Sequence, residues 1–213
     1  HLAKVLRLKA GTEVGVFRGD GKLYLAKVID ASPKKSRLEI LKLLKHDQSE
    51  WGIHLAVAPT KNLGRWETFL EKATEIGIDR ISPILCDNSE RKNLKRERQL
   101  RIIKSAAKQS HKLRFPSLDE MVSFNEFMKQ EQSKKPVFMA HCYEDERKTS
   151  LFKASKGIHN ALVLIGPEGD FSSKEREVIL QNKNFKSFSL GDTILRSETA
   201  AIAGLVLVNH YLN

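Results

Sequence analysis

Arg196 and Glu198 are the side chains in this sequence best suited to chemistry, because they stand at the start of residues 200–208, an almost wholly apolar stretch. A carboxylate accepts protons, and a guanidinium stabilises developing negative charge. Charges at the mouth of a buried helix need partners. A bound ligand meets that need, and so does a structural ion pair between Arg196 and Glu198 that caps the helix.

A glycine turn, Gly166-Pro167-Glu168-Gly169, follows the apolar run of residues 161–165. Turns of this kind often use glycine merely to reach positive φ, so the pattern by itself is a weak signal for a ligand. Its position adds weight, because this turn and residues 190–200 each follow an apolar run typical of a buried strand and lead into a helical pattern. Both segments are therefore expected at the carboxyl edge of an α/β sheet, where such folds bind ligands.

The elements that position these residues alternate from residue 51 onward. The pattern predicts strands and helices at residues 53–58, 64–76, 80–85, 95–111, 136–141, 161–165, 172–181, 185–190 and 197–212. Ser172 and Glu175 fit a capping box at the start of the helix that follows the glycine turn. This alternation predicts an α/β fold, with an open parallel sheet and helices on both of its faces.

The amino-terminal part of the chain is rich in β-forming runs, at residues 14–17, 23–29 and 37–44. The segment Gly19-Asp20-Gly21 between the first two runs is a hairpin signal. We therefore predict a small β-barrel over residues 1–47. Residues 46–50 are polar and unpatterned, which places the domain junction there and a second domain over residues 48–213.

Positive charge is concentrated in two blocks of the chain, whose net charge is +11. Residues 1–45 contain 11 Lys and Arg against 4 Asp and Glu, and residues 89–115 contain 10 against 2. The rest of the chain is net negative. Such a distribution indicates a polyanionic partner rather than a general contribution to solubility.

The second basic block predicts a helix with one charged face. At about 100° per residue, five basic residues fall on one side of it, and Ile102, Ile103, Ala106 and Ala107 fall on the other. The five are Arg98, Arg101, Lys104, Lys108 and Lys112. An ordinary solvated surface helix is the alternative, but five basic residues gathered on one face favour phosphate contact. If all five met phosphates, log affinity would fall with log salt at a slope of about −4.

Several classes of protein are disfavoured by the sequence. No run approaches the roughly 18 apolar residues of a membrane span, and no leader precedes the first domain, which predicts a cytoplasmic protein without a membrane partner. Cys86 and Cys142 are far apart and outside any Cys/His cluster, so we predict buried thiols and no metal site. The motif G-x-G-x-x-G follows no predicted strand, which argues against a nicotinamide-dependent oxidoreductase.

Several blocks of sequence, in order, resemble the bacterial 16S ribosomal RNA (uracil-N3) methyltransferase family, which belongs to the SPOUT class. They are His1-Leu2-Ala3-Lys4-Val5-Leu6-Arg7-Leu8-Lys9, Glu71-Lys72-Ala73-Thr74-Glu75-Ile76-Gly77, Ala106-Ala107-Lys108-Gln109-Ser110 with Pro116, and the two segments 165–171 and 190–200. The likeness covers nearly the whole chain. Blocks matched in this order are much more specific than any one of them.

The resemblance implies the fold, cofactor and partners. It implies a SPOUT-type open parallel sheet with a carboxyl-terminal trefoil knot, preceded by a PUA-like RNA-binding domain. It implies S-adenosyl-L-methionine as cofactor and a homodimer as the assembled form. It also implies N3 methylation of one uridine in small-subunit (16S) ribosomal RNA, either free or in the assembled small ribosomal subunit.

The resemblance also implies site residues. By its account the cofactor-binding residues are Ile165, Gly166, Pro167, Glu168, Gly169, Leu190, Gly191, Ile194, Leu195 and Arg196. For N3 chemistry we take Glu198 as the general base, Arg196 as the group that stabilises negative charge on the uracil carbonyls, and Glu168 as the alternative base. The RNA-binding candidates are Arg7, Lys9, Arg98, Arg101, Lys104, Lys108 and Lys112.

Two features depart from the family pattern. Asp170 stands where relatives usually have a second glycine, which places a carboxylate beside the cofactor loop. The sequence starts at His1, whereas relatives generally carry a strand-forming stretch before this histidine, so we expect the first domain to lack an edge strand. Because of Asp170, a non-catalytic RNA-binding or ribosome-assembly factor on the same fold stays open as the alternative function.

Overall fold

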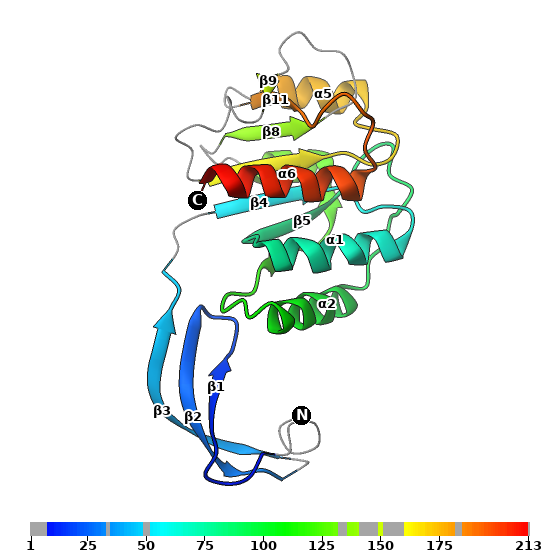
Figure 1. Ribbon diagram of the computed structural model, residues 1–213. Helices are drawn as coiled ribbons and strands as arrows, with labels where there is room; N and C mark the ends of the chain where they lie inside the picture. The colour runs from blue at the N-terminus through cyan, green and yellow to red at the C-terminus, as the bar shows by residue number, and fades with distance from the viewer. Residues whose placement is uncertain are drawn as a thin grey trace. The chain divides into compact units, whose positions relative to one another are not determined.

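The computed structural model describes residues 8–32, 35–48, 52–131, 136–140, 149–150, 160–181 and 185–212. The chain divides into two compact units. The smaller unit comprises residues 1–49 together with 111–115, and the larger comprises residues 50–110 together with 116–213. Figure 1 shows the elements of both units.

The smaller unit contains an antiparallel sheet of three strands in the order β1-β2-β3. The strands are β1 (Glu13–Phe17), β2 (Lys22–Asp30) and β3 (Arg37–His46). Phe17 pairs with Leu23 across the turn, which confirms the predicted hairpin. Gly19 and Gly21 both have positive φ, 91° and 84°, and this requirement explains why the turn uses glycine. The described part of this unit is an open sheet and does not include a closed barrel.

A short segment from later in the chain, His111–Phe115, completes the smaller unit. The Gly21 N–H donates to the Leu113 carbonyl at 2.9 Å, and the Phe115 N–H donates to the Gly19 carbonyl at 3.1 Å. The sequence pattern had extended a helix through His111, but that residue has a φ of 55°. A left-handed residue ends a helix, and the chain then turns into a β-type pairing.

The larger unit is built on a parallel sheet, as predicted. Its strand order is β6-β5-β4-β10-β8-β11-β9, with β7 paired to β5. Every pairing described in it is parallel. The strands are β4 (Gly52–Val57), β5 (Arg80–Leu85), β6 (Ser117–Leu118), β7 (Val122–Ser123), β8 (Val137–Ala140), β9 (Thr149–Ser150), β10 (Asn160–Ile165) and β11 (Phe185–Ser189).

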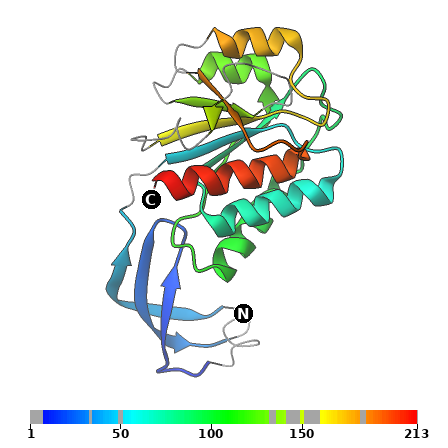
Figure 2. The same cartoon turned by 45° about the horizontal axis from the view of Figure 1, so that its top comes forward.

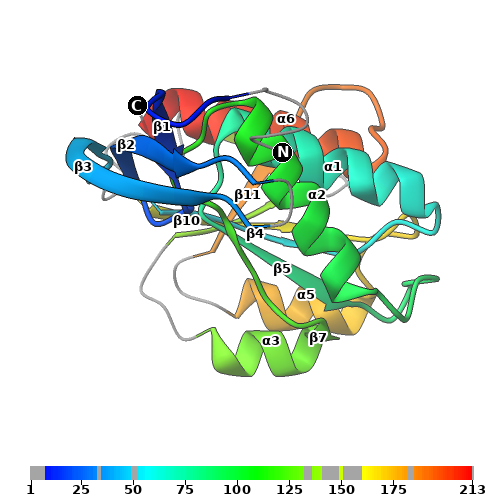
Figure 3. The same cartoon turned by 90° about the horizontal axis from the view of Figure 1, so that it is seen from below.

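Helices cover both faces of this sheet, which also agrees with the sequence pattern. One face carries α1 (Leu63–Ile76), α2 (Arg96–Gln109) and α6 (Ser197–Leu212), and the other carries α3 (Phe124–Gln130) and α5 (Ser173–Leu180) (Figure 3). The capping box of α5 forms between Ser172 and Glu175 as predicted. The pattern missed α3 and the two-residue strands, because elements of so few residues carry little periodicity.

Two apolar layers form the core, one on each side of the sheet. Along β10, Val163 and Ile165 contact the layer under α1 and α6, whereas Leu162 and Leu164 contact the layer on the α3 and α5 side. Because both faces of a parallel strand are buried, its sequence is a continuous apolar run. This is why residues 161–165 predict a strand but do not reveal which side chain faces which helix.

Helix α6 lies beside α1 on the sheet (Figure 2). Ala201, Leu205 and Val208 are fully buried, but 46% of Val206 is exposed. One chain therefore leaves part of this apolar helix uncovered. The trefoil knot stays a prediction, since residues 141–148, 151–159 and 182–184 lie outside the described part. Among the described residues, no helix has the length and apolar character needed to cross a bilayer.

Candidate functional site

The carboxyl edge of the sheet brings the two sequence-predicted segments to the same side of the larger unit. Because the strands are parallel, the loops after β4, β5, β10 and β11 all leave from this edge (Figure 1). They span residues 58–62, 86–95, 166–172 and 190–196. We call these four loops the carboxyl-edge loops, and the site is built from them and from the first turns of α1 and α6.

Gly166 is required by a close approach of the backbone to the core. A Cβ atom at this position would lie 3.2 Å from the Phe171 ring and 3.2 Å from the Phe171 nitrogen. Phe171 is fully buried and so has little room to move. Neither Gly166 nor Gly169 has positive φ, so the simple turn explanation for these two glycines is wrong.

Asp170 adopts the left-handed conformation, with a φ of 58°. Its N–H donates to the Pro167 carbonyl at 3.0 Å, and its Oδ1 accepts the Phe171 N–H at 2.7 Å. Glycine enters this region without strain, and aspartate is one of the few other residues that tolerate it. The departure from the family pattern is therefore compatible with the same loop shape.

The second predicted segment forms an open loop between β11 and α6. Gly191 has a φ of 120°, and Ser189 both accepts the Gly191 N–H at 3.2 Å and donates to its carbonyl at 3.0 Å. Within the described residues, no hydrogen bond engages the backbone of residues 193–195. Ile194 is 86% exposed. The loop thus offers free backbone donors and acceptors beside an exposed apolar side chain.

Glu198 makes its ion pair with a residue that the sequence analysis did not single out. Its Oε1 lies 3.6 Å from Nε of Arg65, in the first turn of α1. The alternative that Arg196 and Glu198 pair with each other is not what the described residues adopt. Arg196 is exposed, and its side chain makes no hydrogen bond or ion pair within the described part of the chain.

Glu168, the alternative base, holds a neighbouring loop. Its Oε1 accepts the Lys61 N–H at 2.9 Å, which ties the glycine turn to the loop after β4. The ammonium of Lys61 lies 2.7 Å from Oε2 of Glu90, and this hydrogen-bonded carboxylate raises the pKa of Lys61. In the described part of the chain, the Glu168 carboxylate therefore joins two loops by binding a backbone N–H, which the Glu198 carboxylate does not do.

The basic face of α2 is narrower than the helical pattern predicts. Arg98 makes two contacts with Glu67 of α1, Nε to Oε1 at 2.5 Å and Nη2 to Oε2 at 2.9 Å, and these contacts raise the pKa of Arg98. Arg101, Lys104 and Lys108 are exposed on the helix. Helix α2 ends at Gln109, so Lys112 lies beyond it. A helical wheel reveals neither the acidic partner of Arg98 on another helix nor the left-handed His111 before Lys112.

The other RNA-binding candidates belong to the smaller unit. Lys9 is exposed there, and Arg7 lies outside the described residues.

Of the two cysteines, Cys142 lies outside the described residues. Cys86 is 4% exposed, and its burial, together with the negative charge of Glu175, raises the pKa of its thiol. The prediction of a buried thiol is therefore confirmed for Cys86.

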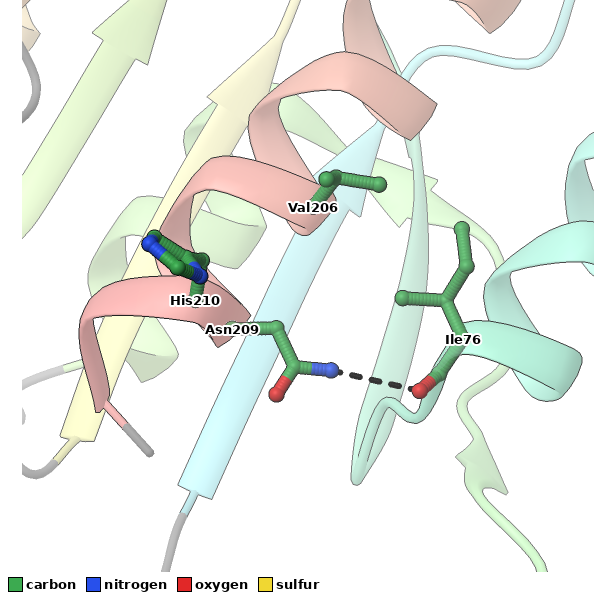
Figure 4. A pocket seen from close by; sticks show the side chains of 4 residues that line it. All are labelled: Ile76, Val206, Asn209 and His210. Carbon is green, nitrogen blue, oxygen red and sulfur yellow. Dashed lines mark hydrogen bonds between the residues drawn. The ribbon is translucent and has the colours of Figure 1, made fainter.

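Two hollows in the larger unit lie away from the carboxyl-edge loops. One of about 430 Å³ is lined by Ile76, Val206, Asn209 and His210, at the carboxyl ends of α1 and α6, where the Asn209 amide donates to the Ile76 carbonyl at 3.2 Å (Figure 4). The other, of about 520 Å³, is lined by Arg80, Ser82 and Asp119, among others. Arg80 forms ion pairs there with Asp119 at 2.8 Å and with Glu131 at 3.5 Å. Among the described residues, no cluster of three His, Cys, Asp or Glu side chains is arranged to hold a metal.

The chain matches two family models. Residues 47–209 match an RNA methyltransferase domain, and residues 1–41 match an RNA methyltransferase PUA domain. Among curated relatives, ribosomal RNA small subunit methyltransferase E of Rickettsia conorii is 28% identical over 98% of this chain and 84% of the relative. The protein of the same name from Aquifex aeolicus is 29% identical over 94% of this chain and 86% of the relative.

Solved structures agree with these matches. A protein described as a probable rRNA-methyltransferase, from Porphyromonas gingivalis, superposes with a TM-score of 0.91 at 32% identity, covering 99% of this chain and 89% of the other. A methyltransferase from Legionella pneumophila in complex with bound SAM superposes with a TM-score of 0.82 at 26% identity, covering 99% and 87%. With the fold, the carboxyl-edge loops and both domain matches in agreement, the chain belongs to the family of RNA methyltransferases that carry a PUA domain.

Proposed function

We propose that this protein methylates N3 of one uridine in small-subunit ribosomal RNA, with S-adenosyl-L-methionine as methyl donor. The observation that carries the proposal is the meeting, at the carboxyl edge, of two backbone loops with Arg196 and the Arg65–Glu198 pair. Membership of the RNA methyltransferase family supplies the reaction class. The names of the curated relatives support small-subunit ribosomal RNA as the substrate.

The carboxyl-edge loops fit this cofactor. No other described residue makes a hydrogen bond to the backbone of residues 193–195, which can therefore bind adenine and ribose, and the exposed Ile194 suits an apolar contact. When bound, S-adenosyl-L-methionine supplies a methyl group that its sulfonium makes electrophilic. The residues that would hold it are Ile165, Gly166, Pro167, Glu168, Gly169, Leu190, Gly191, Ile194, Leu195 and Arg196. Gly166 serves there because a side chain would strike Phe171.

The chain's own groups prepare the uracil. The N3–H of the imide is a weak acid, and its conjugate base is the better nucleophile. Glu198 accepts the N3 proton as general base, and Arg65 holds its carboxylate in place. The exposed guanidinium of Arg196 stabilises the negative charge that develops on the flanking carbonyls. Glu168 is the weaker candidate for base, because its carboxylate already binds the Lys61 N–H.

RNA binding uses the basic residues of each unit. In the larger unit, we assign phosphate contacts to Arg101, Lys104 and Lys108, with a smaller part for Arg98 because Glu67 neutralises it. In the smaller unit, Arg7, Lys9 and Lys112 are the candidates. The proposed domain boundaries are residues 1–47 for the PUA-like domain and 48–213 for the methyltransferase domain, close to the two family matches.

The active form is a homodimer in the cytoplasm, acting on the assembled small subunit. Two exposed apolar residues support a dimer, because Ile194 beside the site and Val206 farther along α6 are 86% and 46% exposed in the single chain. An assembled subunit is the substrate that accounts for selection of one uridine among many. A small enzyme contacts too few bases to make that selection from local sequence alone.

The test is transfer of a labelled methyl group to small ribosomal subunits that lack the modification. The products are digested to nucleosides, which are identified by mass spectrometry. We expect 3-methyluridine, and free small-subunit RNA should be a poorer substrate. Methylation of another base would contradict the N3 assignment. A chain that neither transfers methyl groups nor binds S-adenosyl-L-methionine would support the non-catalytic RNA-binding alternative.

A further inference from the structure

We propose that Asn88 is a positioning residue that fixes the shape of residues 166–170 for cofactor binding. Asn88 lies in the loop between β5 and α2, a part of the chain that neither the sequence motifs nor the family resemblance assigns to the site. The inference rests on the proposed function in one respect, namely that residues 166–169 contact S-adenosyl-L-methionine.

The side-chain amide of Asn88 donates hydrogen bonds to the last residue of the glycine turn and to the residue after it. Its Nδ2 donates to the Gly169 carbonyl at 3.0 Å and to the Asp170 carbonyl at 2.9 Å. Two consecutive carbonyls thus converge on one donor group. Converging carbonyl dipoles repel each other unless a donor lies between them, so the amide of Asn88 stabilises this particular backbone shape.

The turn also packs directly against Asn88. A Cβ atom on Gly169 would lie 3.1 Å from Cβ of Asn88, so this position is a glycine because the loops come so close. The next residue, Asp170, is held in the left-handed region. A non-glycine residue keeps this conformation only where the surrounding structure holds it there. Asn88 contributes to that by binding the carbonyl of Asp170 itself.

The residues on either side of Asn88 are held by hydrogen bonds. The Cys86 N–H donates to Oγ of the buried Ser89 at 3.0 Å, and the Asp87 N–H donates to Oε1 of Glu175 at 2.9 Å. The hydroxyl of Ser172 donates to Oδ2 of Asp87 at 2.6 Å. Since Ser172 and Glu175 form the capping box of α5, the loop that carries Asn88 is tied to the helix that follows the glycine turn.

The loop that carries Asn88 also binds the loop after β4, which is the other loop in contact with the glycine turn. Nε of Arg91 donates to the Thr60 carbonyl at 3.3 Å, and its Nη2 donates to the Lys61 carbonyl. The Lys61 N–H in turn donates to Glu168 of the turn. Residues 86–91 therefore hold both flanks of residues 166–170, and Asn88 is the member that contacts the backbone of the turn directly.

The role assigned to Asn88 predicts a particular split in the kinetics. Asn88 acts through the loop and touches no reacting group, so its loss should weaken cofactor binding and leave the chemical step nearly unchanged. We expect a higher KM and Kd for S-adenosyl-L-methionine, with kcat at saturating cofactor within about threefold of wild type. A purely structural residue would lower the melting temperature without this split.

The test compares Asn88→Asp with Asn93→Asp. Each variant replaces an amide by a carboxylate of the same shape in the same loop. Asn93 is exposed and makes no hydrogen bond or ion pair within the described residues, so it controls for the added charge. In Asn88→Asp, acceptor oxygens replace the donor between two carbonyls, and we expect Kd for S-adenosyl-L-methionine, measured by calorimetry, to rise by about tenfold or more. Asn93→Asp should match wild type.

A third variant, Asn88→Ala, removes the donor without adding charge and is measured alongside for the case in which Asn88→Asp fails to fold. We expect a rise of about threefold to tenfold in Kd with a normal melting temperature of the cofactor-free protein. An unchanged Kd in a folded Asn88 variant, beside a wild type that binds, would overturn the role of Asn88 and leave the proposed function intact. If wild type itself failed to bind, the proposed function would fall, and this inference with it.

Discussion

Nε of Arg65 lies 3.6 Å from Oε1 of Glu198, and this ion pair joins the first turn of α1 to the first turn of α6. The Glu198 side chain is 13% exposed, so most of its surface is taken up by the protein and its carboxylate has few orientations open to it. Arg196, two residues earlier, is left exposed. One arginine thus orients the carboxylate, and the other is available to a substrate.

The first prediction concerns Glu198→Gln. The amide cannot accept the N3 proton, so we expect kcat to fall by about 10²- to 10⁴-fold while Kd for S-adenosyl-L-methionine stays near that of wild type. Methyl transfer and calorimetry measure the two quantities. Near-normal turnover with intact binding would remove Glu198 as the base. Glu168→Gln is the comparison, and it should lower kcat much less.

The second prediction separates the two arginines. Arg65→Gln should lower kcat by about tenfold through a misdirected carboxylate, and should change the free energy of unfolding by less than about 1 kcal/mol, because Arg65 is 40% exposed. Arg65→Lys should recover part of the activity. Arg196→Gln removes the charge that we propose stabilises the uracil carbonyls, and it should lower kcat more than Arg65→Gln does. Denaturant titration and methyl transfer measure these effects, and a reversed order would contradict the assigned roles.

The third prediction concerns the salt dependence of RNA binding. Lys104→Gln should reduce the slope of log affinity against log salt by about 1, because one phosphate contact is lost. Arg98→Gln should change the slope by less, since Glu67 already neutralises Arg98. Filter binding at several salt concentrations gives the slopes. Equal losses for the two variants would show that Arg98 leaves Glu67 when RNA binds.

The fourth prediction concerns the left-handed residue of the glycine turn. Asp170→Gly should keep the cofactor affinity and nearly the full stability, since glycine adopts a φ of 58° without strain. Asp170→Ala should be about 1–2 kcal/mol less stable than Asp170→Gly, because a Cβ atom is disfavoured in the left-handed region that residue 170 adopts. Denaturant titration compares the two variants. Equal stability would mean that the turn changes shape in one of them.

The sequence predicts those features that depend on neighbours along the chain. The bounds of β5 and α6 and the capping box of α5 agree with the pattern, because alternation, helical periodicity and capping act over a few residues. The predicted parallel sheet with helices on both faces is confirmed, because a regular alternation of strands and helices has few other solutions. The resemblance to the RNA methyltransferase family is confirmed by the two domain matches.

Only the tertiary structure decided which charged side chains form ion pairs with each other. Arg65 and Glu198 lie 133 positions apart in the sequence, Arg98 finds Glu67 on another helix, and Asn88 meets Gly169 across two loops. No local pattern encodes such pairs, since each depends on where the packing of buried apolar faces places two helices or loops. The sequence by itself determined the fold class and the two segments of the site. The orientation of the Glu198 carboxylate and the hydrogen bonds that hold residues 166–170 came from long-range packing.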